Sequence, residues 1–377
     1  MKNYCNEKLK GGNILATKSK RQFEIKVLFE HGYTPQKRAF WVEKYWKTIL
    51  GIVITSVFLL FLIRSADPAR LWATLCGAKY SLIITSSGLT IILFLLKTIR
   101  WNVILKRQNV ALSFTTTLKL ILIGTFGSAI TPAKVGDVLR AFYLREEKKE
   151  VKIGSAVFSV VFDRLFDLAG IFMIILLTLP FCLLAIPTID WRIPVGISSS
   201  FVLFTSLVIL TFSEKVLRPL LNFLLKIISK VFLKETVKEK FSISSAEILA
   251  DFFKYQKNFK VKNYFFLGGL SVLFWVILGF QGTLLLYAFH INNVNPFFIL
   301  ATLAIAAVVA MTVPLSVSGV GIREYVIQTF LVFLIPGLVK AQAINLSLLQ
   351  TLENVFLPAF LGGIIIIFLS RKKVMLK

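Results

Sequence analysis

Residues 155–179 read SAVFSVVFDRLFDLAGIFMIILLTL, a run of 25 residues with only three charged side chains. A hydrophobic run of about 20 residues is long enough to cross the hydrocarbon core of a bilayer as an α-helix. The charges of Asp163, Arg164 and Asp167 lie inside this run, where ionised side chains are expensive and usually functional. The stretch therefore predicts a membrane-spanning helix with a polar cluster along its length.

The composition of the whole 377-residue chain agrees with this prediction. Apolar residues make up 56% and charged residues 17% of the chain, against about 45–50% and about 25% in soluble domains. The apolar residues come in blocks, which excludes a soluble enzyme, a disordered chain and an outer-membrane β-barrel. We predict an all-α polytopic membrane protein with about eight transmembrane helices plus re-entrant broken-helix elements.

Nine apolar segments carry this prediction, and several are shorter than the roughly 20 residues of a full span. Two of the short ones run into breaks rich in Pro, Gly and Ser. Such breaks are tolerated at membrane depth only where protein or a water-filled cavity covers the backbone. The segments are 49–63, 81–96, 116–131, 155–179, 195–212, 264–289, 297–315, 322–337 and 349–369.

The polar segments give the expected domain organisation. Residues 1–48 are a basic cytoplasmic tail, 49–370 the transmembrane domain and 371–377 a basic cytoplasmic C-terminus. Within the domain, 213–263 is a basic amphipathic segment expected on the inner leaflet. Counted together with the loops at 97–115 and 145–154, the segments of this side hold 34 Lys and Arg, against 5 in the opposite loops at 64–80, 180–194, 290–296 and 338–348. This bias places both termini in the cytoplasm, with the protein in the cell (plasma or inner) membrane.

The two breaks have opposite orientations. The charge count is self-consistent only if 116–131 turns back at Pro132 and returns through 133–144 as a re-entrant hairpin. Segments 297–315 and 322–337 start and finish on the outer side, either as two full spans or as a hairpin opening outward. Broken elements of opposite orientation are typical of inverted-repeat transporters, so an inverted repeat is one interpretation.

Ten charged side chains lie within or beside apolar segments, five of each sign. Asp163 and Asp167 share a helix face because they are four residues apart, and a guanidinium from Arg164 or Arg140 would keep both ionised. The cluster is either a gating or coupling network or a structural lock between helices. The ten are Lys119, Lys134, Asp137, Arg140, Asp163, Arg164, Asp167, Arg323, Glu324 and Glu353.

The first break has the sequence features of an anion site. Thr131 and Pro132 resemble a helix start, with Thr as N-cap and Pro in the first turn. The positive end of that helix would face a cavity beside Lys134 and Arg140, and a lipid phosphate is the obvious anion. Alternatively, the cap merely closes a broken helix.

The second break offers a similar arrangement, with Ser316 or Ser318 as the cap and Arg323 adding positive charge. No catalytic, metal or cofactor site is expected. The only histidines are His31 and His290, no CxxC pair occurs, and no Gly-rich phosphate loop of P-loop spacing is present.

These residues resemble the membrane domain of the lysylphosphatidylglycerol synthase family, also called the flippase-like or UPF0104 family. The order and rough spacing of three family motifs agree over about residues 45–370. Asp137 stands where Glu is commoner, and Ser318 replaces a glycine of the last motif. The motifs are Pro-x-x-x-Gly-[Glu/Asp]-x-x-Arg at Pro132, Gly136, Asp137 and Arg140, [Glu/Asp]-Arg-x-x-Asp at Asp163, Arg164 and Asp167, and Pro-x-x-Gly-Gly-x-Gly-x-x-Glu at Pro314, Gly319, Gly321 and Glu324.

Some family members fuse this domain to a soluble aminoacyl-transferase or glycosyltransferase, and this sequence contains neither. The resemblance therefore implies translocation or handling of a lipid rather than lysylphosphatidylglycerol synthesis. We predict a flippase for a phospholipid or a polyprenyl- or glycan-linked phosphate lipid. Two alternatives stay open: a membrane subunit of a lipid-modifying transferase, and a non-transporting scaffold for such an enzyme. The expected partners are membrane lipids with anionic headgroups and a lipid-modifying enzyme, but no nucleic acid.

In this prediction the headgroup phosphate is held by Arg140, Arg164 and the helix start at Thr131. The acidic residues position these arginines, or bind a cationic headgroup or a coupling proton. The complete set of predicted substrate-binding and transport residues is Thr131, Pro132, Lys134, Gly136, Asp137, Arg140, Asp163, Arg164, Asp167, Pro314, Gly319, Gly321, Arg323 and Glu324.

Overall fold

A computed structural model describes the helical part of the chain. It covers residues 67–131, 135–184, 253–255, 259–292, 294–312 and 318–375, with isolated positions 56, 60, 64, 206 and 219. All of them belong to one compact unit, 50–377. The predicted tail 1–48 lies outside the described residues, as do nearly all of 49–63 and 195–212 and most of 213–263.

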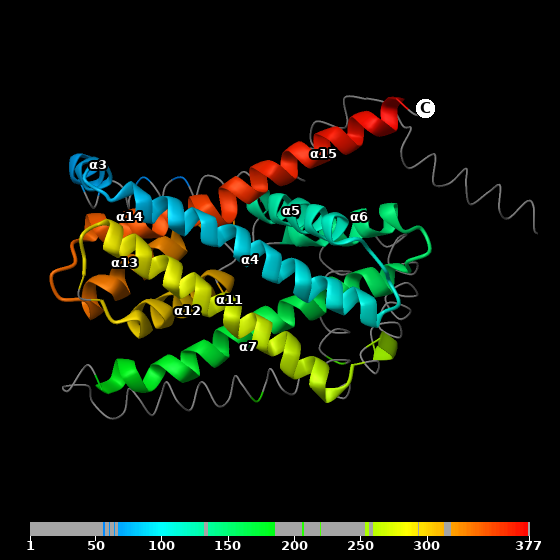
Figure 1. The fold of residues 1–377 in the computed structure, drawn as a ribbon, viewed down its shortest axis with the longest axis horizontal. Helices are drawn as coiled ribbons and strands as arrows, with labels where there is room; N and C mark the ends of the chain where they lie inside the picture. The colour runs from blue at the N-terminus through cyan, green and yellow to red at the C-terminus, as the bar shows by residue number, and fades with distance from the viewer. Residues whose placement is uncertain are drawn as a thin grey trace, which may run out of the picture. The chain divides into compact units, whose positions relative to one another are not determined.

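All regular structure in the described ranges is helical (Figure 1). Four helices, Tyr80–Arg107, Ile153–Cys182, Val261–Ala288 and Lys340–Leu369, are long and apolar enough to cross a membrane. The prediction of an all-α polytopic membrane protein is therefore confirmed. The elements are α3 (Pro68–Cys76), α4 (Tyr80–Arg107), α5 (Phe114–Ile130), the 3₁₀ turn η1 (Val135–Val138), α6 (Leu139–Glu147), α7 (Ile153–Leu184), α11 (Val261–Ala288), α12 (Pro296–Thr312), α13 (Ile322–Leu334), α14 (Lys340–Thr351), the π turn η2 (Leu352–Phe356) and α15 (Leu357–Met375).

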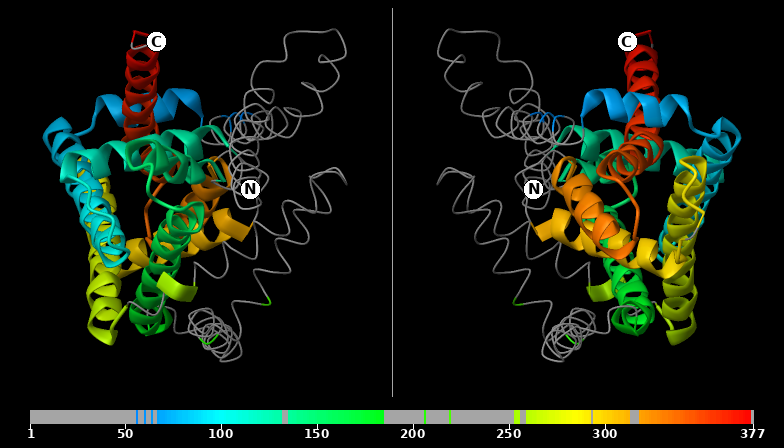
Figure 2. Two further views of the ribbon diagram at one scale, coloured as in Figure 1. Left: turned by 90° about the vertical axis from the view of Figure 1, so that its right-hand side faces the viewer. Right: turned by 90° about the vertical axis from the view of Figure 1, so that its left-hand side faces the viewer.

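Helices α4, α7 and α11 pack against one another, with α4 and α11 along one side of the described unit (Figure 2). The first half of α7 contributes Phe158 and Phe162 to an apolar core shared with Trp101. Its second half contributes Ile171 to a separate core shared with Leu303. The charged residues of α7 lie between these two apolar regions, so the helix brings a polar cluster to their boundary.

The first predicted hairpin begins with α5, which has 17 residues and is followed by a reversal of the chain. The turn η1 packs back onto α5, and the backbones of Gly127 and Gly136 touch, so a Cβ atom on either would collide with the other residue. Two glycines thus permit an approach that no other residue type would allow. The turn-back expected near Pro132 is present, although Pro132 itself is not among the described residues.

Replacing Gly127 by alanine is expected to lower the unfolding free energy by about 1–3 kcal/mol, because the new methyl group overpacks this contact. Gly88 is the matched control, since a Cβ atom there meets nothing within 4 Å. The Gly88→Ala variant should be as stable as the native protein or slightly more stable. Denaturant unfolding in detergent measures both variants, and equal stabilities would contradict the close packing of α5 on η1.

The second hairpin consists of α12 and α13, which pack against each other. With 13 residues, α13 spans only about 20 Å, whereas the hydrocarbon core is about 30 Å thick. This length favours the hairpin over two full spans. The turn between them uses left-handed backbone conformations at Ser318, Gly319 and Gly321, with φ of 57°, 80° and 94°. Ser318 adopts a conformation that favours glycine, the residue that the family motif has at this position.

Two predicted boundaries are wrong. Helix α4 does not end at residue 96 but continues through Arg107, so most of the expected loop at 97–115 is helical. The charges of Lys97 and Arg100 suggested a helix end, because a single sequence does not show the aspartates that pair with Arg100. The last span begins at Lys340 rather than at 349, so the expected outer loop at 338–348 is mostly helical.

Candidate functional site

A set of ion pairs connects α4, η1, α6 and α7 in the interior. The Nε atom of Arg100 lies 2.7 Å from Oδ1 of Asp163, and its Nη2 atom lies 2.6 Å from Oδ1 of Asp167. The Nη2 atom of Arg140 lies 2.8 Å from Oδ2 of Asp163 and 3.3 Å from Oδ2 of Asp137. Each of these arginines therefore joins two aspartates.

Arg164 completes the connection. It pairs with Asp137, and its Nη1 atom lies 2.7 Å from Oδ2 of Asp167. The result is a closed Arg–Asp ring in which every arginine contacts two aspartates and every aspartate contacts two arginines, so the six charges cancel. Five members are buried, whereas the side chain of Arg164 is 35% exposed. The members are Arg100, Asp137, Arg140, Asp163, Arg164 and Asp167.

Further contacts hold the ring in place. Nη1 of Arg100 donates to Oγ of Ser271 on α11, at 2.8 Å, and the guanidinium of Arg140 lies 5.0 Å from the ring centroid of Trp101. A single charge inside a membrane helix costs about 2.5–3.5 kcal/mol on insertion scales. Pairing removes much of this cost, which explains how α7 carries three charges.

The ring contains an arginine that sequence reasoning missed. Asp163 and Asp167 share a face of α7 as predicted, but the guanidinium between them belongs to Arg100 of α4, not to Arg164 or Arg140 alone. Lys119, also among the ten charges, is exposed on α5. It takes no part in the ring.

The predicted cap at the first break is wrong. Thr131 ends α5: its hydroxyl donates to the carbonyl of Gly127 and accepts the N–H of Gly136, both at 2.8 Å. The next turn is the short 3₁₀ turn η1, which carries Asp137. This carboxylate lies in the first turn of η1 and pairs there with Arg140 and Arg164. Pro132 and Lys134 lie outside the described residues.

At the second break the half-buried Arg323 pairs with the buried Glu324. Nη2 of Arg323 lies 3.1 Å from Oε1 of Glu324, and Oε2 of Glu324 accepts the N–H of Gly321 at 2.5 Å. Thr351 on α14 donates to Oε1 of Glu324 at 2.5 Å and also contacts Arg323. The N-cap of α13 is therefore Gly321, whose own N–H is bound by Glu324, and the prediction of Ser318 as the cap is wrong. Pro314 and the alternative cap Ser316 lie outside the described residues.

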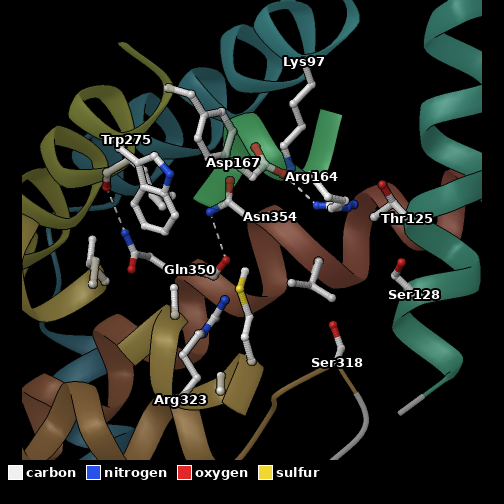
Figure 3. A pocket seen from close by; sticks show the side chains of 17 residues that line it. Lys97, Thr125, Ser128, Arg164, Asp167, Trp275, Ser318, Arg323, Gln350 and Asn354 are labelled. Carbon is white, nitrogen blue, oxygen red and sulfur yellow. Dashed lines mark hydrogen bonds and ion pairs between the residues drawn. The ribbon is translucent and has the colours of Figure 1, made fainter. Parts of the chain in front are cut away.

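A cavity of about 140 Å³ lies beside the Arg–Asp ring (Figure 3). Lys97 and Arg164 approach it from one side and Arg323 from the other. Hydroxyl and amide groups line part of its wall, and apolar side chains line the rest. The polar lining consists of Lys97, Thr125, Ser128, Arg164, Asp167, Ser318, Arg323, Gln350 and Asn354, and the apolar lining includes Phe274, Trp275, Leu278, Leu303, Ala307, Ala310, Met311 and Val355.

The ammonium group of Lys97 is the cation of this cavity that no carboxylate neutralises among the described residues. Asp167 is the carboxylate that lines the same cavity, but both of its oxygens are engaged by arginines of the ring. Lys97 instead lies 4.8 Å from the ring centroid of Phe274 and 5.2 Å from that of Phe94. The indole N–H of Trp275, also at the cavity, has no hydrogen-bond partner in the described part of the chain.

The cavity is therefore equipped to bind an anion. Three cationic side chains border it. The one carboxylate in its lining, Asp167, is already paired with two arginines of the ring. In the part of the chain that the structure describes, no group of three or more His, Cys, Asp and Glu could hold a metal ion.

The fold and this site define a polytopic helical membrane protein with a neutral ion-pair ring beside a cationic cavity. Residues 48–362 match the family model described as "Lysylphosphatidylglycerol synthase TM region". The chain belongs to this family, as its three motifs predicted.

Two similar relatives are UPF0104 membrane proteins. The chain is 24% identical over 346 residues to one from Pyrococcus horikoshii, a match that covers 86% of this chain and 97% of the relative. It is 24% identical over 344 residues to another from Methanocaldococcus jannaschii, covering 86% and 96%.

Proposed function

We propose that the protein is a flippase-like lipid transporter that takes the phosphate-bearing headgroup of a membrane lipid into the cavity. The observation that supports this proposal is the cavity itself, in which the uncompensated charge of Lys97 faces an apolar wall. Such a lining fits an amphiphile, with phosphate at the cations and acyl or prenyl chains along the apolar residues. The substrate class is a phospholipid or a polyprenyl- or glycan-linked phosphate lipid.

Each polar group has a proposed role. Lys97 and Arg164 hold phosphate oxygens by charge-assisted hydrogen bonds, and Arg323 contacts the headgroup from the opposite side. The free indole N–H of Trp275 supplies a further donor. The other five members of the ring are buried and hold Arg164 in position. Of these five, Asp167 also lines the cavity, where it is paired with Arg164.

The proposed orientation keeps both termini in the cytoplasm, with the protein in the cell membrane. The end of α4 carries Lys106 and Arg107. It meets the start of α7, where Oγ of Ser155 donates to Oε1 of Gln108 at 2.5 Å, and Lys148 borders the same hollow as Gln108. These basic residues therefore gather at one end, which supports a cytoplasmic position under the positive-inside rule.

The Arg164→Ala variant tests the proposal. We expect leaflet exchange of fluorescent phosphatidylglycerol in liposomes to fall to the protein-free background. The variant should still fold and assemble, because Asp137 remains paired with Arg140 and Asp167 remains paired with Arg100. Lys119→Ala, which removes an exposed lysine of α5, should exchange lipid at the native rate.

Native exchange by folded Arg164→Ala protein would contradict the proposal. Failure of this variant to fold would instead favour the structural-lock interpretation of the charges.

A further inference from the structure

Glu353 is a buried carboxyl group that only neutral donors contact. Its Oε2 atom accepts hydrogen bonds from Oγ of Ser86 and Nε2 of Gln281, both at 2.8 Å. Its Oε1 atom accepts one from Oγ of Ser87, also at 2.8 Å. The residue is 2% exposed, and none of the ion pairs of the described residues includes it.

The balance of interior charges makes Glu353 the counterpart of Lys97. Among the described residues, ten ionisable Lys, Arg, Asp and Glu side chains are not exposed. Six form the neutral Arg–Asp ring, and Arg323 pairs with Glu324. The two left over are Lys97, at the cavity, and Glu353. With Lys97 positive and Glu353 negative, the charges of the described interior therefore sum to zero.

A short chain of hydrogen bonds joins Glu353 to the cavity. Oε1 of Gln281 accepts from Nδ2 of Asn354 at 2.9 Å, and Asn354 lines the cavity (Figure 3). Glu353 and Asn354 both belong to the π turn η2, inserted between α14 and α15. Such turns within α-helices are frequent at functional sites. A change in the charge of Glu353 can therefore affect the cavity in two ways, through the amide of Gln281 or through the turn η2 that contains both Glu353 and Asn354.

We infer that Glu353 is a proton-binding site whose occupancy is linked to anion binding in the cavity. The inference rests on the proposed function. A lipid phosphate beside Lys97 would compensate that lysine and leave Glu353 as the uncompensated charge of the described interior. An isolated buried carboxylate is costly, so uptake of one proton, which converts the carboxylate to a neutral acid and changes no other bond, accompanies binding.

The hydrogen bonds identify the oxygen that takes the proton. The amide N–H of Gln281 can only donate, so Oε2 stays an acceptor. A serine hydroxyl can donate or accept, so protonated Oε1 donates to Oγ of Ser87. Ser87 is only half-buried, which gives the proton a route. Thr90, which shares this face of α4, also accepts from Nε2 of Gln281.

Among the described residues, no other titrating group contacts this carboxyl. The described side chains that contact it from α4 and α11 are hydroxyls and an amide. Two residues before Glu353, Thr351 binds Glu324 and Arg323 of α13, which also pair with each other. Lys97 lies ten residues further along α4 than Ser87, about 15 Å away.

Proton uptake during lipid binding tests this inference. The probe is dihexanoyl-phosphatidylglycerol, whose phosphodiester does not titrate between about pH 5 and about pH 9. With purified protein in weakly buffered detergent, we expect binding to take up as much as one proton per lipid. The affinity should fall by up to about tenfold per pH unit where Glu353 is ionised in the free protein.

The Glu353→Gln variant keeps the shape of the protonated acid. It should bind this lipid without proton uptake and without pH dependence, at an affinity close to that of the native protein at low pH. The matched control is Glu150→Gln, at an exposed glutamate, which should behave as the native protein does.

The outcomes separate this inference from the proposed function. Lipid binding without proton uptake, or uptake that persists in Glu353→Gln, overturns the inference and leaves the proposed function standing. Absence of lipid binding at every pH overturns the linkage together with the proposed function. Infrared spectra then show whether Glu353 binds a proton at all: a carboxylic-acid C=O band should be lost as the pH rises and be absent from Glu353→Gln, and its absence from the native protein overturns the proton site.

Discussion

Replacing Arg100 by alanine is expected to lower the unfolding free energy by about 3–5 kcal/mol, the usual effect of breaking a buried charge pair from one side. The side chain of Arg100 is 2% exposed and binds both Asp163 and Asp167. Its loss leaves two buried aspartates with one arginine each and removes the hydrogen bond to Ser271. Water cannot replace the guanidinium in so closed a position, so little folded protein should accumulate in the membrane.

The Arg164→Ala variant is the matched comparison for this prediction. Arg164 also joins two aspartates, but its side chain is 35% exposed to the cavity, where water can solvate the carboxylates it leaves. Unfolding by denaturant in detergent should show a much larger loss of stability for Arg100→Ala than for Arg164→Ala. Equal losses would contradict the assignment of Arg100 to the interior support and Arg164 to the cavity wall.

Replacing Lys97 by glutamine is expected to weaken the binding of dihexanoyl-phosphatidylglycerol by about 10- to 100-fold. A hydrogen bond to a charged group contributes about 1.5–3 kcal/mol, and about 1.4 kcal/mol corresponds to a factor of ten. The folded protein should keep its stability, because Lys97 forms no ion pair among the described residues and glutamine retains most of its contact with Phe94 and Phe274. Titration calorimetry of the purified variant measures the affinity.

Lys106→Gln is the control for Lys97→Gln, because Lys106 is an exposed lysine of the same helix. It should bind the lipid as the native protein does. Equal affinities for Lys97→Gln and native protein would show that the cavity does not recognise phosphate through this ammonium group. A folded Lys97→Arg variant should recover part of the affinity.

The helices could be predicted from hydropathy, but the ends of α4 and α14 could not. Lys97 and Arg100 suggested a loop because each charge lowers the local hydropathy. A signal for the longer helix was present nevertheless, since Trp101, Ile104 and Leu105 continue the apolar spacing beyond them and are buried. A single sequence does not show that Arg100 pairs with the aspartates of α7, and this pairing offsets the free-energy cost of burying its charge.

The Arg–Asp ring was predicted in part. Asp137, Arg140, Asp163, Arg164 and Asp167 were chosen from their cost in a membrane, and the structure brings all five together. Their closure into a ring depends on Arg100, which lies 63 residues from Asp163 in sequence. A contact between residues so far apart in sequence cannot be predicted from the spacing of residues within one helix.

The caps failed for a different reason. A Thr-Pro step fits both the end of one helix and the start of another, and at Thr131 the hydroxyl ends α5. At the second break, the spacing of three residues between Gly321 and Glu324 was a usable signal for the observed cap. Glu353 was recognised as an interior charge, but its partners are neutral residues of α4 and α11 that no charge pattern reveals.

The most direct test of the central claim, that the cavity takes a lipid phosphate, is headgroup-resolved leaflet exchange in liposomes containing the purified native protein. Two fluorescent lipids are compared, phosphatidylglycerol and glucosylceramide, because the second has a polar headgroup without phosphate. Exchange of phosphatidylglycerol well above the protein-free background, with glucosylceramide at that background, is the predicted result. Equal exchange of both lipids by folded protein would contradict phosphate recognition, and exchange of glucosylceramide alone would contradict the account altogether.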